Sequence, residues 1–349
     1  MAEPGDQTPS EPETSPPQGE NPSFWREGRA ALQLVFQSRL VLLIVFVLTF
    51  VASLQFLLGG RGINSLDLLS PDPMRLWHLL VALQPTLWLA SMLGVFGELE
   101  RRALVWPGSR RERLALVFCT AFISGMAFLP VLTPFLGNPF SLPANAEVLT
   151  GVPHMRAKMF VFYSLGSVAG VLLTSGMLSV HIQLAGGPPR NPSGGEQPVT
   201  GSLEREVLRY QRLRAQLKRC LGFAGGIISA SVLTVSTFHN AITGAVPTQP
   251  GVFPATAAMG FGIYFTAFLA IIYLPASKTL SEAGEALAAR LVPPSPGAHT
   301  PWKHWSEERQ AVRTYLGLEG SALQELQQGL TLLSPFIASL STLLLGTGR

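Results

Sequence analysis

Six histidines and two cysteines are the side chains of this sequence that could bind a metal ion or transfer protons. A zinc site needs several such ligands close together, commonly two histidines on one helix face. No two of these histidines have that spacing, no cysteine or carboxylate completes a zinc set, and no glycine-rich phosphate loop with its lysine is present. We therefore predict no metal site, no cofactor and no catalytic residue, and the sequence favours a non-enzymatic protein. The residues are His78, His154, His181, His239, His299, His304, Cys119 and Cys220.

A second set of polar side chains could form a binding layer. The set has six residues, which lie at similar depth in the same half of five long apolar stretches. They could line a site for a small neutral solute, or they could hydrogen-bond one another and hold helices together. We favour the second interpretation. The residues are Gln84, Thr133, Tyr163, His239, Asn240 and Tyr264.

The elements that must position these residues are six long apolar stretches, none of which contains Asp, Glu, Lys or Arg. A helix crosses the hydrocarbon core of a membrane with about 20 mostly apolar residues, because lipid cannot hydrogen-bond to the backbone. Composition agrees, since 47% of the residues are hydrophobic and 13% are charged. The sequence predicts an all-α, polytopic integral membrane protein with about six transmembrane helices. The stretches are residues 40–58, 76–96, 114–136, 159–184, 221–246 and 257–276.

The distribution of positive charge gives an orientation. With a cytoplasmic N-terminus and six spans, four of the 25 Lys and Arg residues fall in outer loops and the other 21 fall inside. Cytoplasmic loops carry such an excess, so we predict both chain ends in the cytoplasm. The composition is typical of a bacterial inner membrane protein, and no motif indicates nucleic acid as a partner. One basic loop could also attract anionic lipid through Arg101, Arg102, Arg110, Arg111 and Arg113.

The chain divides by composition into five segments. Residues 1–23 are rich in Pro, Glu, Ser and Gly and are predicted to be a disordered cytoplasmic tail. Residues 24–185 hold an interfacial helix and the first four spans, and residues 186–219 hold a cytoplasmic linker with a basic helix. Residues 220–290 hold spans five and six with a cytoplasmic extension, and residues 291–349 are a cytoplasmic tail.

The extensions of spans five and six should stand side by side as a helical stalk, because the two spans are consecutive and antiparallel. We expect contacts between arginines of the first extension and glutamates of the second. For the start of the tail, from His299 to Trp305, we predict an ordinary turn with a tryptophan pair. The stalk residues are Arg205, Arg209 and Arg212, opposite Glu282 and Glu285.

The tail ends in an amphipathic helix, predicted over residues 321–345. Ser321 and Gln324 match a capping box, and seven aliphatic residues then follow heptad spacing. This contact stripe could meet the stalk, another copy of the chain, a partner protein or the membrane surface. Residues 330–345 could instead form a short seventh span, although about 24 Å of helix is less than a hydrocarbon core of ~30 Å. The stripe is Leu323, Leu326, Leu330, Leu333, Ile337, Leu340 and Leu344.

Small residues at four-residue spacing occur in the fourth and fifth spans. In lipid, such positions let helix backbones approach closely. We therefore expect one helix–helix seam along Gly166, Gly170 and Thr174, and another along Gly222, Gly226, Ala230 and Thr234.

Three functions are compatible with these patterns. We favour a membrane scaffold or signal-coupling component that contacts a partner, or another copy of itself, through the stalk and the tail. The alternative is a passive channel or carrier for a small neutral solute through the polar layer, and an intramembrane enzyme comes third. No motif in the sequence identifies a substrate or a reaction.

Overall fold

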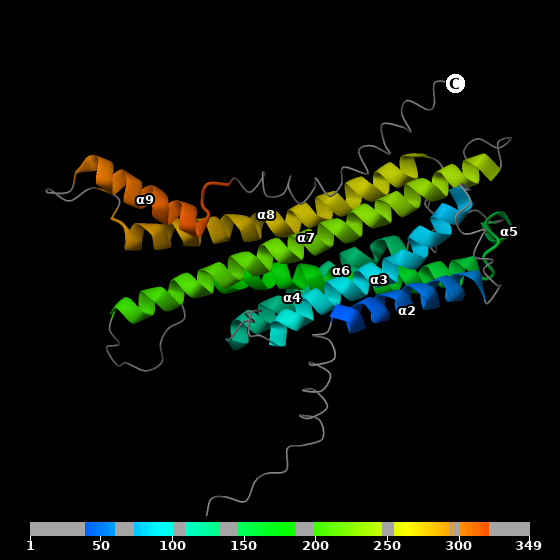
Figure 1. Ribbon diagram of the computed structural model, residues 1–349, viewed down its shortest axis with the longest axis horizontal. Helices are drawn as coiled ribbons and strands as arrows, with labels where there is room; N and C mark the ends of the chain where they lie inside the picture. The colour runs from blue at the N-terminus through cyan, green and yellow to red at the C-terminus, as the bar shows by residue number, and fades with distance from the viewer. Residues whose placement is uncertain are drawn as a thin grey trace, which may run out of the picture. The chain divides into compact units, whose positions relative to one another are not determined.

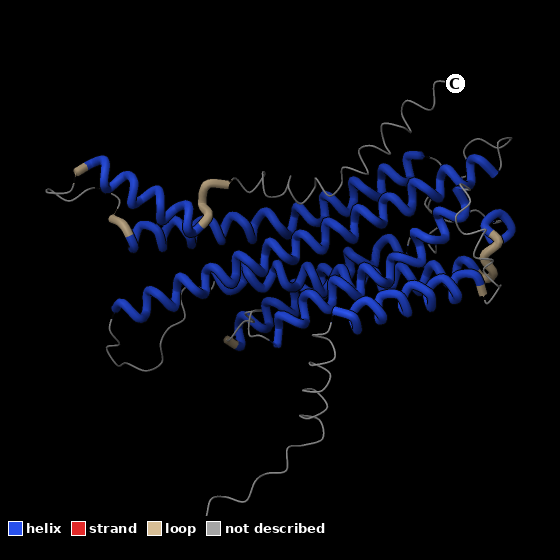
Figure 2. The backbone as a smooth tube through the Cα atoms, in the orientation of Figure 1, coloured by secondary structure: helices blue, strands red, loops and turns tan. Residues whose placement is uncertain are grey.

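The structure is a computed structural model that describes residues 39–59, 73–100, 109–132, 146–185, 199–245, 255–293, 295 and 301–320. All regular structure in these residues is helical (Figures 1 and 2). The chain divides into two units, Met1–Val45 and Phe46–Arg349, and the described part of the first is the beginning of α2. The helices are α2 (Arg39–Leu58), α3 (Pro73–Glu100), α4 (Arg110–Leu132), α5 (Ala146–Thr150), α6 (Met155–Ala185), α7 (Val199–Ala245), α8 (Ala255–Leu291) and α9 (Trp302–Leu316).

Six of the described helices are long and apolar enough to cross a membrane, which confirms the all-α, multipass prediction. They are α2, α3, α4, α6, α7 and α8. The two longest exceed by far the length that a bilayer requires. α7 has 47 residues and α8 has 37, so they are about 70 Å and 55 Å long, against a hydrocarbon core of ~30 Å.

Within the second unit, α6 packs against α3, α4, α7 and α8. α3 and α7 run antiparallel, because Trp77 near the start of α3 packs against Phe238 near the end of α7, and Gln84, further along α3, bonds to Thr234, which is earlier in α7. α7 and α8 lie side by side, as Figure 1 shows in green and yellow. The bundle therefore alternates up and down, as short connections between consecutive spans require.

The bundle has two ends, which we name for the short helices found there. At the α5 end, His78 near the start of α3 lies 3.1 Å from the carbonyl oxygen of Thr150 in α5. At the α9 end, α9 packs against α8. Each end has its own apolar cluster. Trp77, Met155 and Ile242 belong to the one at the α5 end, and Tyr210, Leu287 and Leu316 belong to the part of the other that lies at the α9 end.

Large apolar side chains remain exposed on the outer faces of the spans. On α4, Phe118 is 77% exposed and Phe122 is 69% exposed. On α8, Ile271 is 69% exposed. Exposed apolar surface of this kind along helices of spanning length is surface for lipid tails, so the chain contacts a bilayer.

The predicted small-residue faces meet a neighbour in part: Thr234 of the α7 face accepts a hydrogen bond from Gln84 of α3. A Cβ atom added at Gly170, Gly222 or Gly226 would meet no described atom within 4 Å, so these three glycines are not points of close approach in the described part of the chain. Only Gly166 is in close contact, because an added Cβ would lie 2.9 Å from the ring of Trp88. Spacing identified a small face in each helix, but it could not indicate whether that face meets a neighbour.

Candidate functional site

The polar layer is anchored by Gln84, which is buried between α3 and α7. Its amide nitrogen donates to the hydroxyl oxygen of Thr234 at 2.9 Å, and its amide oxygen accepts from Ser231 at 3.4 Å. The hydroxyl of Thr234 in turn donates to the carbonyl oxygen of Ala230 in its own helix. These contacts join two antiparallel helices in the way that interhelical hydrogen bonds do in membranes.

The other predicted layer residues lie in several different surroundings. The hydroxyl of Tyr264 in α8 donates to the carbonyl oxygen of Met126 in α4 at 2.6 Å. Tyr163 packs against the apolar cluster of the α5 end, His239 is half-buried and Asn240 is exposed. Thr133 lies outside the described residues. The described contacts of Gln84 and Tyr264 therefore go to different helices, and each contact links two spans.

Two polar atoms close to Gln84 are buried without a hydrogen-bond partner within the described part of the chain. They are the hydroxyl oxygen of Thr86 and the indole nitrogen of Trp88, both in α3. Buried polar groups are nearly always satisfied, because an unpaired one costs about 1–3 kcal/mol.

A second polar region, which was not predicted from the sequence, lies nearer the α9 end. Ser175, Ser179 and Gln183 follow one another at four-residue spacing in α6, and all three are buried. Gln183 donates to Ser179 at 2.9 Å, and Gln216 of α7 donates to the carbonyl oxygen of Gly176 at 2.9 Å. The four-residue spacing was a signal that could have identified this ladder, since such positions share a helix face.

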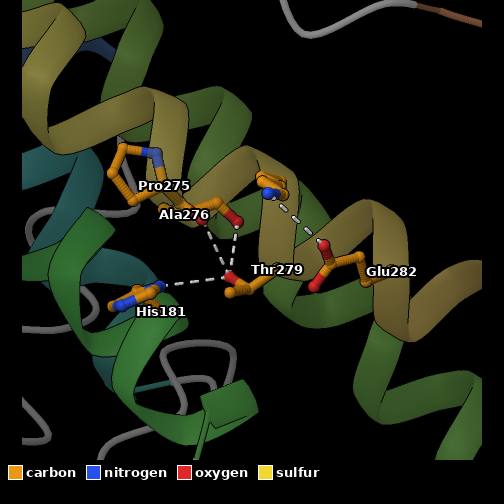
Figure 3. Close-up of polar contacts among 6 residues, drawn as sticks. His181, Pro275, Ala276, Thr279 and Glu282 are labelled. Carbon is orange, nitrogen blue, oxygen red and sulfur yellow. Dashed lines mark hydrogen bonds and ion pairs between the residues drawn. The ribbon is translucent and has the colours of Figure 1, made fainter.

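The same region contains the contact between α6 and α8 that Figure 3 shows. His181 Nδ1 lies 3.2 Å from the hydroxyl oxygen of Thr279, which itself lies 3.1 Å and 3.0 Å from the carbonyl oxygens of Pro275 and Ala276. Because the Thr279 hydroxyl donates to these carbonyls, its oxygen is left to accept from the imidazole. Next to Thr279 in α8, Lys278 forms an exposed ion pair with Glu282, one turn further along, at 3.9 Å. Such an exposed pair contributes at most about 1 kcal/mol.

The structure places a folded group of helices at the α9 end, which we name the α7–α8–α9 module. It comprises residues 203–221 of α7, 276–292 of α8 and 302–318, which include α9. Leu213, Leu217 and Leu316 are each at most 1% exposed, so this part of the chain has an apolar core of its own. The indole nitrogen of Trp305 donates to the carbonyl oxygen of Pro293 at 2.9 Å and fixes the start of α9.

The end of α9 is fixed by Arg214 of α7. Its guanidinium donates to the carbonyl oxygens of Leu316 at 2.9 Å and Gly317 at 2.7 Å, and the hydroxyl of Tyr210 also approaches the Leu316 carbonyl at 3.4 Å. Gly317 has a φ of 68°, and the Leu318 amide donates to the Arg313 carbonyl. This is a Schellman ending, and a cation beside it complements the negative end of the helix dipole.

Two expectations about this region are wrong. The stretch from His299 to Trp305 was expected to be a turn, yet α9 begins at Trp302, although the expected tryptophan pair is present with the rings of Trp302 and Trp305 4.8 Å apart. The stalk arginines were expected to face Glu282 and Glu285. Instead Glu285 pairs with Arg313 of α9 at 2.8 Å and Glu282 with Lys278, while Arg290 of α8 pairs with Glu206 of α7 at 2.6 Å. Sequence places charges on a helix, but packing sets the register between helices, and here Tyr210 lies against Gly284.

Parts of two predicted contact sites lie outside the described residues. Of the basic cluster, Arg110, Arg111 and Arg113 are exposed at the start of α4, and Arg101 and Arg102 are not described. The whole contact stripe from Leu323 to Leu344 also lies beyond the described chain. In the described part, no three His, Cys, Asp or Glu side chains come together as a metal site would need.

A comparison of the chain with protein-family models, with curated proteins and with solved structures found no match. The class that the helices define is a multipass membrane protein.

Proposed function

We propose that this protein is a membrane scaffold or signal-coupling component that contacts a partner protein through its α7–α8–α9 module. The observation that carries the proposal is the folded module itself. α7 has 47 residues where about 20 cross a bilayer, and the excess length is packed with α8 and α9 around buried leucines. A structured end of this kind, rich in exposed charge, offers a soluble partner a rigid surface.

We propose that the module faces the cytoplasm of a bacterial inner membrane. Its part of α7 carries Arg205, Arg212, Lys218 and Arg219 on exposed positions, as the positive-inside rule expects. The exposed arginines at the start of α4 are then available to anionic headgroups at about 1 kcal/mol per charge. The cytoplasmic position of the module and the headgroup contact of these arginines both depend on the orientation of the chain in the membrane, so orientation is measured first.

Cysteine labelling in intact cells tests the orientation. With Cys119 and Cys220 replaced by alanine, Glu308→Cys in α9 should resist a membrane-impermeant maleimide until the cells are opened. Glu147→Cys in α5 should react in intact cells. Both native glutamates are exposed, so accessibility is matched. The opposite pattern would reverse the proposed orientation.

Site-specific photo-crosslinking tests the partner. A photoreactive residue at Tyr315 of α9, which is 61% exposed, should give discrete protein adducts in membranes. The same residue at Phe118 of α4, which is 77% exposed among lipid-facing side chains, is the control. Adducts that are equally frequent at both positions would contradict a contact role for the module. An adduct of twice the chain's mass would identify a second copy as the partner.

The C-terminal stripe is a further proposed contact surface, outside the described residues. Leu330→Glu with Ile337→Glu should leave the membrane helices inserted but release a partner or dissociate an oligomer, because buried leucines each contribute about 1.5–3 kcal/mol. Native mass analysis in detergent would show this. Unchanged assemblies would remove the tail from the proposal, and a C-terminus cleavable only from outside would indicate a seventh span.

The second candidate function is passage of a small neutral solute through the polar layer. The unpaired atoms of Thr86 and Trp88 favour it, and the contacts of Gln84 and Tyr264 favour a structural layer instead. Solute flux into liposomes separates the two. If the layer is structural, His239→Leu should leave any flux at the background of empty liposomes. A flux present in wild type and lost in His239→Leu would favour a conduit.

A further inference from the structure

We propose that residues 330–345, which lie outside the described residues, form a seventh span that packs on an exposed row of α8. The α8 row is Ile263, Ala267, Ile271 and Leu274, whose spacing of four, four and three residues places them on one helix face. The inference goes beyond the proposed function, which concerns the α7–α8–α9 module. It places the C-terminus on the side of the membrane opposite to that module, whereas the sequence alone favoured both chain ends on one side.

The α8 row is apolar, and the described residues leave it uncovered. Ile263 is 65% exposed, Ile271 is 69% exposed and Leu274 is 39% exposed. Ala267, between them, is also exposed. The bundle packs on the other side of α8, where Tyr273 is 0% exposed. The row is therefore the side of α8 that is left for lipid or for another helix.

α9 runs back along α8 toward this row (Figure 1). The two helices are antiparallel, because Trp305 near the start of α9 bonds to Pro293, and Arg313 near its end pairs with Glu285. Glu285 follows Leu274 by eleven residues, which is about three helical turns, so it lies on the same face as the row. The chain that follows α9 therefore starts in line with the α8 row.

The length of the chain beyond the described residues matches the distance to the row. Leu318 packs against Gly284, since a Cβ added there would lie 2.6 Å from it. Gly284 is ten residues from Leu274, or about 15 Å along α8, and residues 321–329 would cover about 14 Å as a helix. Residues 330–345 would then run for about 24 Å beside α8, from the level of residue 274 to that of residue 258.

The sequence of residues 330–345 suits a span with one packed face. It contains no charged residue. Ser334, Ala338 and Ser341 share a helix face, and small or hydroxyl-bearing residues at such positions let helices approach closely in lipid. The contact stripe lies on another face of the same helix, so it is left toward lipid or toward a second copy of the chain.

The short length of this segment and its proline are compatible with a span. About 24 Å of helix is less than a hydrocarbon core of ~30 Å, but a bilayer accommodates such a difference by thinning locally. Membrane helices tolerate a proline such as Pro335. Only Arg349 follows the segment, so the excess of positive charge on the side of the module is almost unchanged.

Side-specific labelling of the C-terminus tests the span. With Cys119 and Cys220 replaced by alanine, Gly348→Cys should react with a membrane-impermeant maleimide from the same side as Glu147→Cys of α5. It should react from the side opposite to Glu308→Cys of α9. Both reference glutamates are exposed, and the comparison holds whichever way the protein is oriented in the membrane.

Thr347→Cys provides a second tail position if the Gly348→Cys variant is poorly produced. Reaction of the tail cysteine from the side of Glu308→Cys would overturn the seventh span, because residues 330–345 would then have stayed on the side of the module.

Disulfide crosslinking of the full-length protein in membranes tests the packing on α8. Ser334→Cys is combined with Ala267→Cys or with Ile271→Cys, and with Phe122→Cys of α4 as the control. Phe122 is 69% exposed, as Ile271 is, but belongs to a different helix. We expect a crosslink within one chain to form at least about tenfold faster on α8 than on α4, because two cysteines bridge only when their Cα atoms lie within about 7 Å.

Two results would overturn the packing on α8. Equal rates on α8 and α4 would mean that the tail has no seat on the row. Crosslinks that form only between chains would mean that the tail of a second copy occupies it. Partner adducts at Tyr315 test the proposed function separately, because Tyr315 lies in the described module. Adducts there together with a failed crosslink would leave the proposed function standing and remove only this inference.

Discussion

Two helices of this protein, α2 and α9, end in the same backbone conformation but are held there differently. Gly59 and Gly317 have φ values of 66° and 68°. At α2, where the described residues end at Gly59, the Gly59 amide bonds to the carbonyl of Gln55, and Lys158 donates to the Leu57 carbonyl at 2.8 Å. At α9 two amide bonds form a Schellman ending, and the Arg214 fork takes two carbonyls.

The difference follows from the length and the apolar surface of each helix. α2 is long enough to cross a membrane and exposes large apolar side chains along its length, which suit contact with lipid tails. α9 has 15 residues and little apolar surface, so its position depends on the contacts at its two ends. An ammonium is a point charge on a flexible stem, whereas a guanidinium is a planar fork that fixes an orientation.

The largest effect should come from replacing Gly317, and Gly59 is the matched position at the end of α2. Gly317→Ala forces a side chain into the left-handed region, at about 1–2 kcal/mol, and drives its Cβ into the Arg214 guanidinium. Gly59→Ala has the same backbone cost but meets the Pro153 ring at 2.9 Å. We expect Gly317→Ala to make α9 susceptible to protease while the spans stay protected, and Gly59→Ala to lower the melting temperature of the whole protein slightly. Equal protease resistance of α9 in both variants would contradict the comparison.

The cations at the two ends give the next effect. Arg214→Ala should destabilise the docking of α9 by about 1.5–3 kcal/mol, the usual range for hydrogen bonds to a charged group. Arg214→Lys should recover only part of this, because one ammonium cannot reproduce the fork. Lys158→Arg, the reverse exchange, should be almost neutral. Hydrogen exchange of α9 amides and of the last turn of α2 measures both, and full recovery with Arg214→Lys would show that charge alone holds α9.

The smallest effect should come from the ion pair. Arg313→Gln should cost less than about 1 kcal/mol, since the pair with Glu285 is partly exposed and screened by salt. The cost of Arg313→Gln should be smaller still at 0.5 M salt, because salt screens the ion pair. A loss as large as that of Arg214→Ala would mean that side-chain charge, and not backbone capping, positions α9.

The sequence was sufficient to predict the spans but not their contacts. The lengths of the apolar stretches alone identified six helices, because a backbone in lipid must satisfy its own hydrogen bonds, which a helix does. It misplaced the partners of Glu285, because helix register depends on packing. It also missed α9, although Trp305, Val312 and Leu316 have the spacing of one helix face. The site is predicted least well, since Gln84 was identified but its partners on α7 were not.

The contact between Arg214 and the end of α9 has a consequence for how this protein can vary over time. Arg214 donates to main-chain oxygens, so substitutions of the exposed side chains of α9 do not weaken this contact. Positions 214 and 317 are not free in this way, because any side chain at 317 occupies the space of the guanidinium. Among relatives that retain α9, we expect arginine at the first position to occur together with glycine at the second, and a relative that has lost one to have lost the other.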